Sequence, residues 1–252
     1  MSSTEEHIKS HLLSFKSLPV SATWIANFLA SITQTQQRAS LSALTQTAVF
    51  RILASNFTES LSTSSISTLL PRDISDPAIK ERKITGLVPV QVLDIEDIGT
   101  SLWSQVEKIE QVERGETVRG REIVRNVNVD GGDGDNNADA SIRAPGNTGG
   151  HGPHRLVLQD AFGTKAIAIE LKDVKGIAVD KLAIGAKLVL KNTVVGRGMI
   201  LLTPDTVTVL GGKIEIMDTA WRRTRKERLL ARIEALEGGQ RQGGDNGDAM
   251  EE

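Results

Sequence analysis

HRLVLQDAFGTKAIAIEL, residues 154–171, has the pattern of two β-strands joined by a tight turn. Leucines alternate with other residues in the first half, and Ile167, Ile169 and Leu171 alternate in the second half. Alternation of this kind is typical of a strand with one buried face. Gly163 lies in the intervening DAFG and tolerates the positive φ of a turn. The stretch therefore predicts antiparallel β structure.

The sequence before this hairpin contains a long interruption. TVRGREIVRNVNV, residues 117–129, alternates and predicts a first strand, but residues 130–153 are rich in Gly, Asp and Asn. A compact domain rarely carries so long a loop unless the loop is disordered or functional. We expect disorder in the free protein, because this composition cannot bury apolar surface. The interruption favours a binding surface over a catalytic pocket.

The sequence after the hairpin completes a small barrel. Residues 173–182 have apolar residues at a spacing that suits a short helix. KLVLKN (187–192), GRG and MILLT (199–203) predict a hairpin, and TVTVLGG (206–212) closes the sheet. Strand–strand–strand–helix–strand–strand is the order of the OB-fold, a partly open five-stranded barrel. We therefore predict an OB-fold over residues 117–212.

The N-terminal residues 1–71 predict a small bundle of helices. Ser21 and Ser40 each precede a run with helical apolar spacing, so each is expected to cap a helix. The expected buried stripes comprise Ile8, Leu12 and Phe15 in the first helix, Trp24, Ile25, Phe28, Leu29 and Ile32 in the second, and Leu41, Leu44, Ala48, Val49 and Ile52 in the third.

Two further segments flank the predicted barrel. Residues 72–116 are expected to form a connector packed on the barrel, with a helix near its end. Residues 213–237 return to helical spacing, and residues 238–252 have the low-complexity composition of a disordered tail. The predicted fold class is therefore α+β: an N-terminal helical bundle packed on a five-stranded OB-fold barrel with a C-terminal helix.

The composition excludes several classes of protein. The 252 residues carry a net charge of −2, which argues against coating DNA by bulk electrostatics. There is no cysteine, so disulfides and thiolate metal sites are excluded. There is no tyrosine, so a tyrosine nucleophile for DNA strand cleavage is impossible in this chain. The sequence contains no apolar run long enough for a membrane span and no secretory signal pattern, so we expect no membrane association.

No cofactor or metal site is predicted. The loop residues Asp133, Asp135, Asn137 and Asp139 have EF-hand spacing. However, alanine stands at the sixth and twelfth positions, where an EF-hand has Gly and a bidentate Glu. The histidine pairs His7/His11 and His151/His154 have no third ligand in a zinc-hydrolase pattern. The glycine-rich segments match neither a P-loop nor a dinucleotide fingerprint, so we predict no catalytic residues.

Basic residues occur in two groups, which two different uses could explain. Residues 222–232 contain six basic residues and one acidic residue. The candidates for phosphate contacts are Arg222, Arg223, Arg225, Lys226 and Arg228. The favoured interpretation is a solvated face on a helix whose apolar side packs on the barrel. Arg125, Lys172, Lys175, Lys187, Lys191 and Arg197 lie in or beside the predicted strands, where they could steer an acidic partner or hold a DNA backbone.

Aromatic residues are scarce, at 3% of the chain. Between Ser104 and Ala220 the only one is Phe162, in a turn. OB-folds that bind single strands tightly usually stack bases on aromatic side chains, so we expect only weak DNA binding. Trp24 and Trp103 are both expected to be structural, packed against apolar neighbours.

Four segments carry a resemblance to a known family: DIEDIGTSLWSQVEKIE (94–110), EIVRNVNV (122–129), LQDAFGTKAIAIE (158–170) and LLTPDTVTVLGGKIE (201–215). Together with the helical preface and the interrupted first connection, they resemble the N-terminal part of RecQ-mediated genome instability protein 1, over roughly residues 8–225. The resemblance implies a helical module wrapped onto an OB-fold with a long insertion between its first two strands. Because no second OB-fold follows, the chain resembles the short, fungal-type form.

The resemblance also implies a function. The family member is expected to be a non-catalytic, nuclear subunit of a RecQ helicase–topoisomerase III complex, which dissolves double Holliday junctions during DNA repair and homologous recombination. The topoisomerase, a type IA enzyme, is expected to bind the OB-fold, with the insertion reaching its gate. The candidate interface residues are Arg125, Asn126, Asp130, Ile142, Arg143, His154, Lys172 and Lys175. The alternative is an independent single-stranded nucleic-acid-binding OB-fold protein in replication or telomere maintenance.

Overall fold

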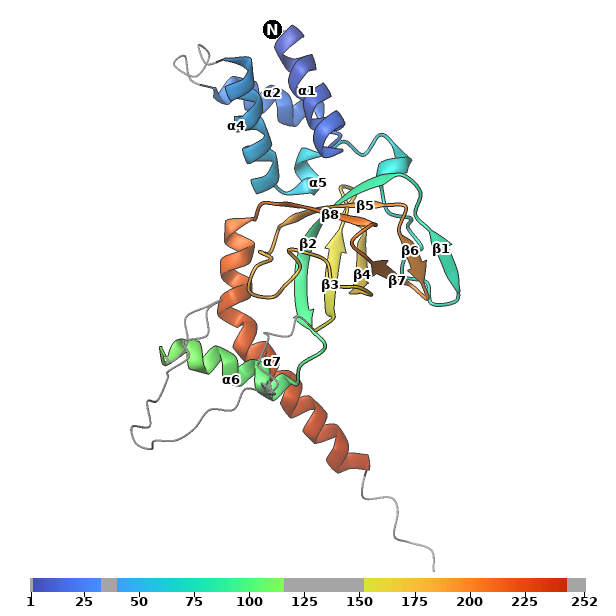
Figure 1. Cartoon of the computed structure of the whole chain (residues 1–252), viewed down its shortest axis with the longest axis vertical. Helices are drawn as coiled ribbons and strands as arrows, with labels where there is room; N and C mark the ends of the chain where they lie inside the picture. Colours follow the sequence, from blue (N-terminus) through green and yellow to red (C-terminus); the bar gives the residue numbers. More distant parts are fainter. Residues whose placement is uncertain (1, 33–39, 116–151, 244–252) are drawn as a thin grey trace, which may run out of the picture.

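The computed structural model describes residues 2–32, 40–115 and 152–243. A helical module lies at one end of a twisted β-sheet, and helix α6 (Leu102–Glu113) lies at the other end (Figure 1). Helix α7 (Glu215–Gly243) runs along one side of the sheet towards α6, which it crosses (Figure 1). The chain is therefore an α+β assembly of helices around a single sheet.

The helical module forms around its own apolar core. Its helices are α1 (Ser2–Lys16), α2 (Ala22–Ser31), α4 (Leu41–Ala54) and α5 (Phe57–Ser60), followed by the 3-10 turn η1 (Ile66–Thr68). The two predicted caps are confirmed, because Ser21 Oγ accepts from Trp24 N at 3.1 Å and Ser40 Oγ accepts from Ala43 N at 3.3 Å. Each cap satisfies an amide that the helix leaves without an intrahelical partner.

The helical stripes were predicted correctly only in part. Ile8, Leu12 and Ile52 are fully buried, as expected. Phe15 was expected on the buried stripe of α1 but is 75% exposed and stacks on His11. Leu41 is also exposed, because it is the first residue of α4 and lies beyond the core contact.

The sheet has eight strands in the order β1-β6-β7-β4-β3-β2-β5-β8. The strands are β1 (Glu81–Lys83), β2 (Leu87–Asp97), β3 (His154–Gln159), β4 (Lys165–Glu170), β5 (Lys187–Lys191), β6 (Val194–Gly196), β7 (Met199–Leu202) and β8 (Val207–Gly211). The β4–β7 pair is parallel, and the other pairs are antiparallel. Because β1 and β8 are the two edges of an eight-stranded sheet, the expected five-stranded barrel is not confirmed.

The strand before the long interruption differs from the one predicted. Residues 117–129 lie outside the described residues, whereas β2 comes from the segment expected to be a connector. β2 pairs with β5 over 87–91 and with β3 over 91–97. Its inward residues Val88, Val90, Val92 and Ile95 are at most 1% exposed and form the centre of the sheet's core. A bulge between Val92 and Asp94 keeps Ile95 facing inwards.

The connection between β4 and β5 is irregular rather than helical. Residues 173–182 form successive turns, so the predicted short helix is wrong. Gly176 interrupts the segment with φ +97°, which is incompatible with a right-handed helix. The apolar residues of the pattern are nevertheless inside, because Val174, Ile177 and Leu182 are all buried.

The last hairpin also differs from the prediction. β5 pairs with β2 and β8, whereas the hairpin is made by β6 and β7 around Arg197 and Gly198. Both turn residues have positive φ, +50° and +80°, as a two-residue hairpin turn requires. MILLT therefore pairs with VVG instead of KLVLKN.

The DAFG turn is confirmed by a hydrogen-bonding aspartate. Asp160 is fully buried, and its carboxylate accepts from Thr164 N and from Leu70 N, each at 2.8 Å. Gly163 has φ +97°. The turn thereby connects the hairpin to the end of the helical module.

The helical module meets the sheet through a buried polar contact. Gln91 of β2 accepts through Oε1 from Phe57 N at 3.0 Å and from Lys187 Nζ at 3.2 Å. Its Nε2 donates to Asn56 and to Gln159. Gly212, the last residue of TVTVLGG, has φ +82° and approaches α4 so closely that a Cβ would lie 2.4 Å from Leu53 O. That position therefore requires glycine.

The C-terminal helix is longer than predicted. α7 spans Glu215–Gly243, so residues 238–243 are helical and do not belong to the expected disordered tail. The remainder of that tail lies outside the described residues. No helix in the described part of the chain is long and apolar enough to cross a membrane.

Candidate protein-binding surface

The long insertion leaves the sheet at the end of β2 and returns at the start of β3. Asp97 lies opposite His154 in the ladder, and one further hydrogen bond joins Ile98 N to Pro153 O at 3.0 Å. Gly99 and Gly152 touch at this point, and a Cβ on Gly99 would lie 2.7 Å from Gly152 Cα. The two ends of the insertion are therefore held together by a short, glycine-dependent neck.

Asp97 organises the start of the insertion. Its Oδ1 accepts from Gly99 N at 2.8 Å and from Thr100 N at 3.1 Å, and its Oδ2 accepts from the Thr100 hydroxyl at 2.9 Å. Ser101 then caps helix α6 (Leu102–Glu113) by accepting from Ser104 N at 3.1 Å. Gln105 of α6 donates back to Asp97 O at 2.8 Å. These hydrogen bonds fix the direction in which α6 leaves the sheet.

His154, at the return of the insertion, is buried. It is 2% exposed, and its Nδ1 lies 2.7 Å from Glu170 Oε2. Glu170 also accepts from His154 N at 3.2 Å and from Val174 N at 2.7 Å. His154 was predicted as an interface residue, but its side chain points into the sheet's interior and is not presented to a partner. Through its contacts with Glu170, His154 anchors β3 to β4.

Helix α6 is held against α7 by polar contacts. Lys226 of α7 lies 2.8 Å from Glu113 and 3.2 Å from Glu110 of α6. The hydrogen bonds to Glu113 and then Glu110 raise the pKa of Lys226 above its ordinary value. Arg225 donates to Gln105 at 3.3 Å. These contacts position the helix that leads into residues 116–151.

Helix α7 is held against the sheet by Trp221 and its neighbours. The buried indole donates through Nε1 to Asp94 of β2, and Arg225 and Arg228 lie over its ring, 5.5 and 5.4 Å from the centroid. Arg228 lies 3.4 Å from Asp94, and Arg232 lies 3.0 Å from Glu96. The basic face of α7 is thus turned partly towards acidic residues of the same chain.

Asp218 makes a second contact between α7 and the sheet. It accepts from Ile184 N at 2.9 Å and from Arg222 at 2.7 Å. Burial raises the pKa of Asp218, but the hydrogen bonds from Arg222 and Ile184 N outweigh burial and leave the pKa below its ordinary value. The carboxylate is therefore charged when it anchors the helix.

The predicted phosphate-contacting residues are mostly engaged within the chain. Arg222, Arg225, Lys226 and Arg228 all have intramolecular partners, and Arg223 is exposed. The partners Asp94, Gln105, Glu110 and Glu113 were not predicted from the sequence, because they come from other elements. Only the i,i+4 pair of Asp218 with Arg222 carries a local signal.

The predicted interface residues divide into three groups. Arg125, Asn126, Asp130, Ile142 and Arg143 lie outside the described residues, as do the four loop residues with EF-hand spacing. Lys172 and Lys175 are exposed just beyond β4. His154 is buried, as described above. Lys187, considered a steering charge, is fully buried between Gln91 and the Phe57 ring.

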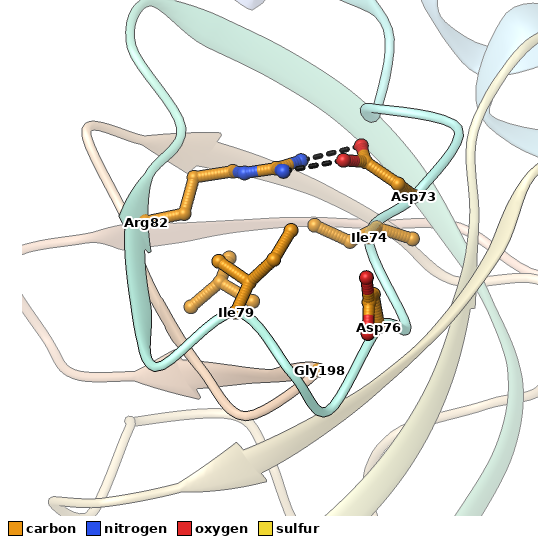
Figure 2. A pocket seen from close by; sticks show the side chains of 7 residues that line it. Asp73, Ile74, Asp76, Ile79, Arg82 and Gly198 are labelled. Atoms are coloured by element: carbon orange, nitrogen blue, oxygen red, sulfur yellow. Dashed lines mark hydrogen bonds and ion pairs between the residues drawn. The ribbon is translucent and has the colours of Figure 1, made fainter.

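No small-molecule site is apparent in the described ranges. A shallow hollow beside β1 is lined by Asp73, Ile74, Asp76, Ile79, Arg82, Val195 and Gly198 (Figure 2). Its empty volume of about 160 Å³ is below the roughly 300–1,000 Å³ of typical ligand pockets. The Arg82 guanidinium spans it to reach Asp73, with a contact of 2.6 Å (Figure 2). Within these ranges no three metal-ligating side chains gather at one point.

Comparison with known proteins identifies two matching regions. The family model described as "RMI1, N-terminal OB-fold domain" matches residues 70–225, and "RMI1, N-terminal helical domain" matches residues 12–60. RecQ-mediated genome instability protein 1 of Schizosaccharomyces pombe is 30% identical over 141 residues, which is 54% of this chain. The match spans 60% of that relative's length.

Proposed function

We propose that this chain, which belongs to the RMI1 family, is a non-catalytic scaffold that binds a type IA topoisomerase III through its OB-fold domain. In this role it acts in the nucleus, links the topoisomerase to a RecQ-family helicase and promotes dissolution of double Holliday junctions. The observation that carries the proposal is the joint match of the helical and OB-fold domains, with an insertion at the neck formed by Asp97 and His154.

The composition and the site support a scaffold over an enzyme. The chain contains no tyrosine, so the strand-cleaving nucleophile must come from a partner. The described residues offer a braced insertion and an ordered α6–α7 junction, with no cluster of nucleophile and general base in a pocket. Such an arrangement suits the positioning of another protein.

The test is binding of purified topoisomerase III from the same organism, followed by a decatenation assay. The full chain is expected to form a stable complex and to stimulate decatenation. Gly99→Val is expected to weaken stimulation, because its side chain collides with Gly152 and opens the neck of the insertion. Gly238→Val is the matched control, since a Cβ there meets nothing within 4 Å and Gly238 does not have a positive φ. A chain that neither binds the topoisomerase nor stimulates it would contradict the proposal.

A further inference from the structure

The outer face of β3, β4, β7 and β6 carries a patch of aliphatic side chains. β4 turns its small apolar residues inwards, since Ala166 and Ala168 are at most 2% exposed. Its larger residues Ile167 and Ile169 therefore face outwards. Burial of apolar area favours the opposite arrangement in an isolated sheet. The outward position of Ile167 and Ile169 therefore indicates that a partner covers the outer face of the sheet.

The register places neighbouring aliphatic residues beside these two isoleucines. Ile167 lies between Val157 of β3 and Met199 of β7, and Ile169 is followed by Leu201 of β7 and Val194 of β6. We call the six residues Val157, Ile167, Ile169, Val194, Met199 and Leu201 the aliphatic patch. All six are partly exposed. The described helices leave this face open, with α7 bordering it on the β2 side through Arg232 and Glu96.

The margin of the aliphatic patch is basic. Lys83 lies opposite Val194, Lys165 begins β4 on the same face, and Lys172 is exposed just beyond the end of β4. These three lysines form no ion pair within the described residues. The acidic residues on the β2 side, Asp94 and Glu96, are already held by arginines. Glu81, which lies opposite Gly196 on the same face of β1, is exposed and offsets part of this charge. The lysines outnumber it, and the remaining positive charge favours an acidic partner.

The chemistry of the aliphatic patch separates a protein partner from a nucleic acid. OB-folds commonly use this face for oligonucleotides, and tight binding of single strands needs aromatic rings for stacking. The aliphatic patch has none. The aliphatic patch lies on four adjacent strands, which span roughly 14 Å, three spacings of about 4.8 Å. This width accommodates one helix of about 10–12 Å diameter.

We propose that the aliphatic patch docks an amphipathic α-helix of a partner protein, with aliphatic residues on its buried stripe and Asp or Glu at its margins. The helix lies along β4 and places its acidic residues against Lys83, Lys165 and Lys172. This surface is distinct from the insertion neck, and the proposal does not depend on the identity of the topoisomerase partner.

The test uses methyl NMR on the full chain with labelled Ile, Leu, Val and Met. The probes are two designed amphipathic peptides that share one leucine stripe, one flanked by Glu and the other by Lys, together with an oligo-dT strand. The Glu peptide is expected to shift the methyl signals of the aliphatic patch and to leave Ile216, an 83% exposed residue of α7, unchanged. Equal shifts with the Lys peptide, no shift with the Glu peptide, or shifts with oligo-dT at these methyls would each overturn the proposal.

A pair of variants tests the same point independently. Ile169→Glu is expected to weaken binding of the Glu peptide about tenfold or more, because it removes apolar contact and adds repulsion. Ile216→Glu makes the same chemical change outside the aliphatic patch and is expected to leave binding unchanged. Equal affinity of the two variants would exclude the patch as the docking site. Because the peptide comparison uses the unmodified chain, the proposal stays testable even if Ile169→Glu does not fold.

Discussion

At the scale of single residues, Lys187 lies between the helical module and the sheet with its ammonium 4.7 Å from the centre of the Phe57 ring. Burial lowers the pKa of Lys187 to about 7 from 10.5. Between these two pH values the unfolded chain binds a proton that the folded chain does not. Stability therefore rises with pH across this window, and the penalty for burying the charge is fully present below pH 7.

Lys187→Met is consequently expected to raise the free energy of unfolding, by about 1–3 kcal/mol at pH 6, because it removes a buried charge and keeps the packing volume. Gln91 Oε1 keeps its hydrogen bond from Phe57 N. Denaturant titrations at pH 6 and pH 10 measure the effect, and the gain should be much smaller at pH 10. Lys191→Met, at the exposed end of β5, is the control. A gain that is equal at both pH values would contradict the shifted pKa.

The two tryptophans that were expected to be structural have different environments. Trp24 is partly buried and stacks on Phe28, with ring centroids 5.5 Å apart. Trp103 is 60% exposed on α6, so the expectation that it is a structural residue packed against apolar neighbours is wrong. Trp24→Ala is expected to cost about 1–3 kcal/mol, less than the 3–5 kcal/mol of a fully buried Trp. Trp103→Ala should change the melting temperature little, as thermal unfolding of the two variants would show. A loss for Trp103→Ala as large as that for Trp24→Ala would contradict the exposed position of Trp103.

At the scale of elements, the α6–α7 junction depends on several exposed ion pairs. Lys226→Glu places like charges beside Glu110 and Glu113. Exposed pairs contribute little individually, so we expect a loss of global stability of less than about 1 kcal/mol. Hydrogen exchange in α6 should accelerate clearly, because α7 is what holds that helix in place. Arg223→Glu, on an exposed part of the same helix, is the control, and equal protection of α6 in both variants would show that the ion pairs do not position it.

Some of the helices, turns and strands could be predicted from the sequence, and others could not. The caps Ser21 and Ser40, the DAFG turn and the C-terminal helix follow from local rules, and each was found. β2 was missed because Pro89 argues against a central strand. In the structure Pro89 pairs with Val189 of β5, and the pairing of β2 with β3 begins only at Gln91. Pro89 lacks an amide N–H, and this is tolerated because β3 does not pair with β2 at that position. Only the staggered register of the sheet shows this.

The candidate surface was less predictable than the fold, because its contacts join distant parts of the chain. The pairing of Lys226 with Glu113, of Arg228 with Asp94 and of His154 with Glu170 has no local sequence signal. Alternation in β4 identified a strand correctly, but the sequence could not show that the alanines rather than the isoleucines face the core.

At the scale of the whole molecule, the arrangement of charge decides between a protein scaffold and an independent DNA-binding protein. The net charge is −2, and four of the five basic candidates on α7 are engaged within the chain. Few cations of α7 are therefore available to displace counterions from DNA. Each phosphate contact contributes a slope of about −0.9 to the plot of log affinity against log salt, so the expected slope is shallow and the affinity low.

We therefore expect DNA binding by the isolated chain with a Kd of about 1 μM or weaker, insensitive to sequence and lost at moderate salt, because no aromatic platform on the outer face of the sheet adds stacking. Fluorescence anisotropy with labelled single-stranded and duplex DNA over a salt series measures this. Arg223→Glu should weaken the residual binding, whereas topoisomerase association through the OB-fold domain should survive. Lys172→Glu changes a charge beside β4 instead of one on α7. Comparing it with Arg223→Glu in the same assays therefore distinguishes the sheet surface from the α7 surface. Nanomolar binding of a single strand that persists at high salt would contradict the scaffold and favour a nucleic-acid-binding OB-fold protein.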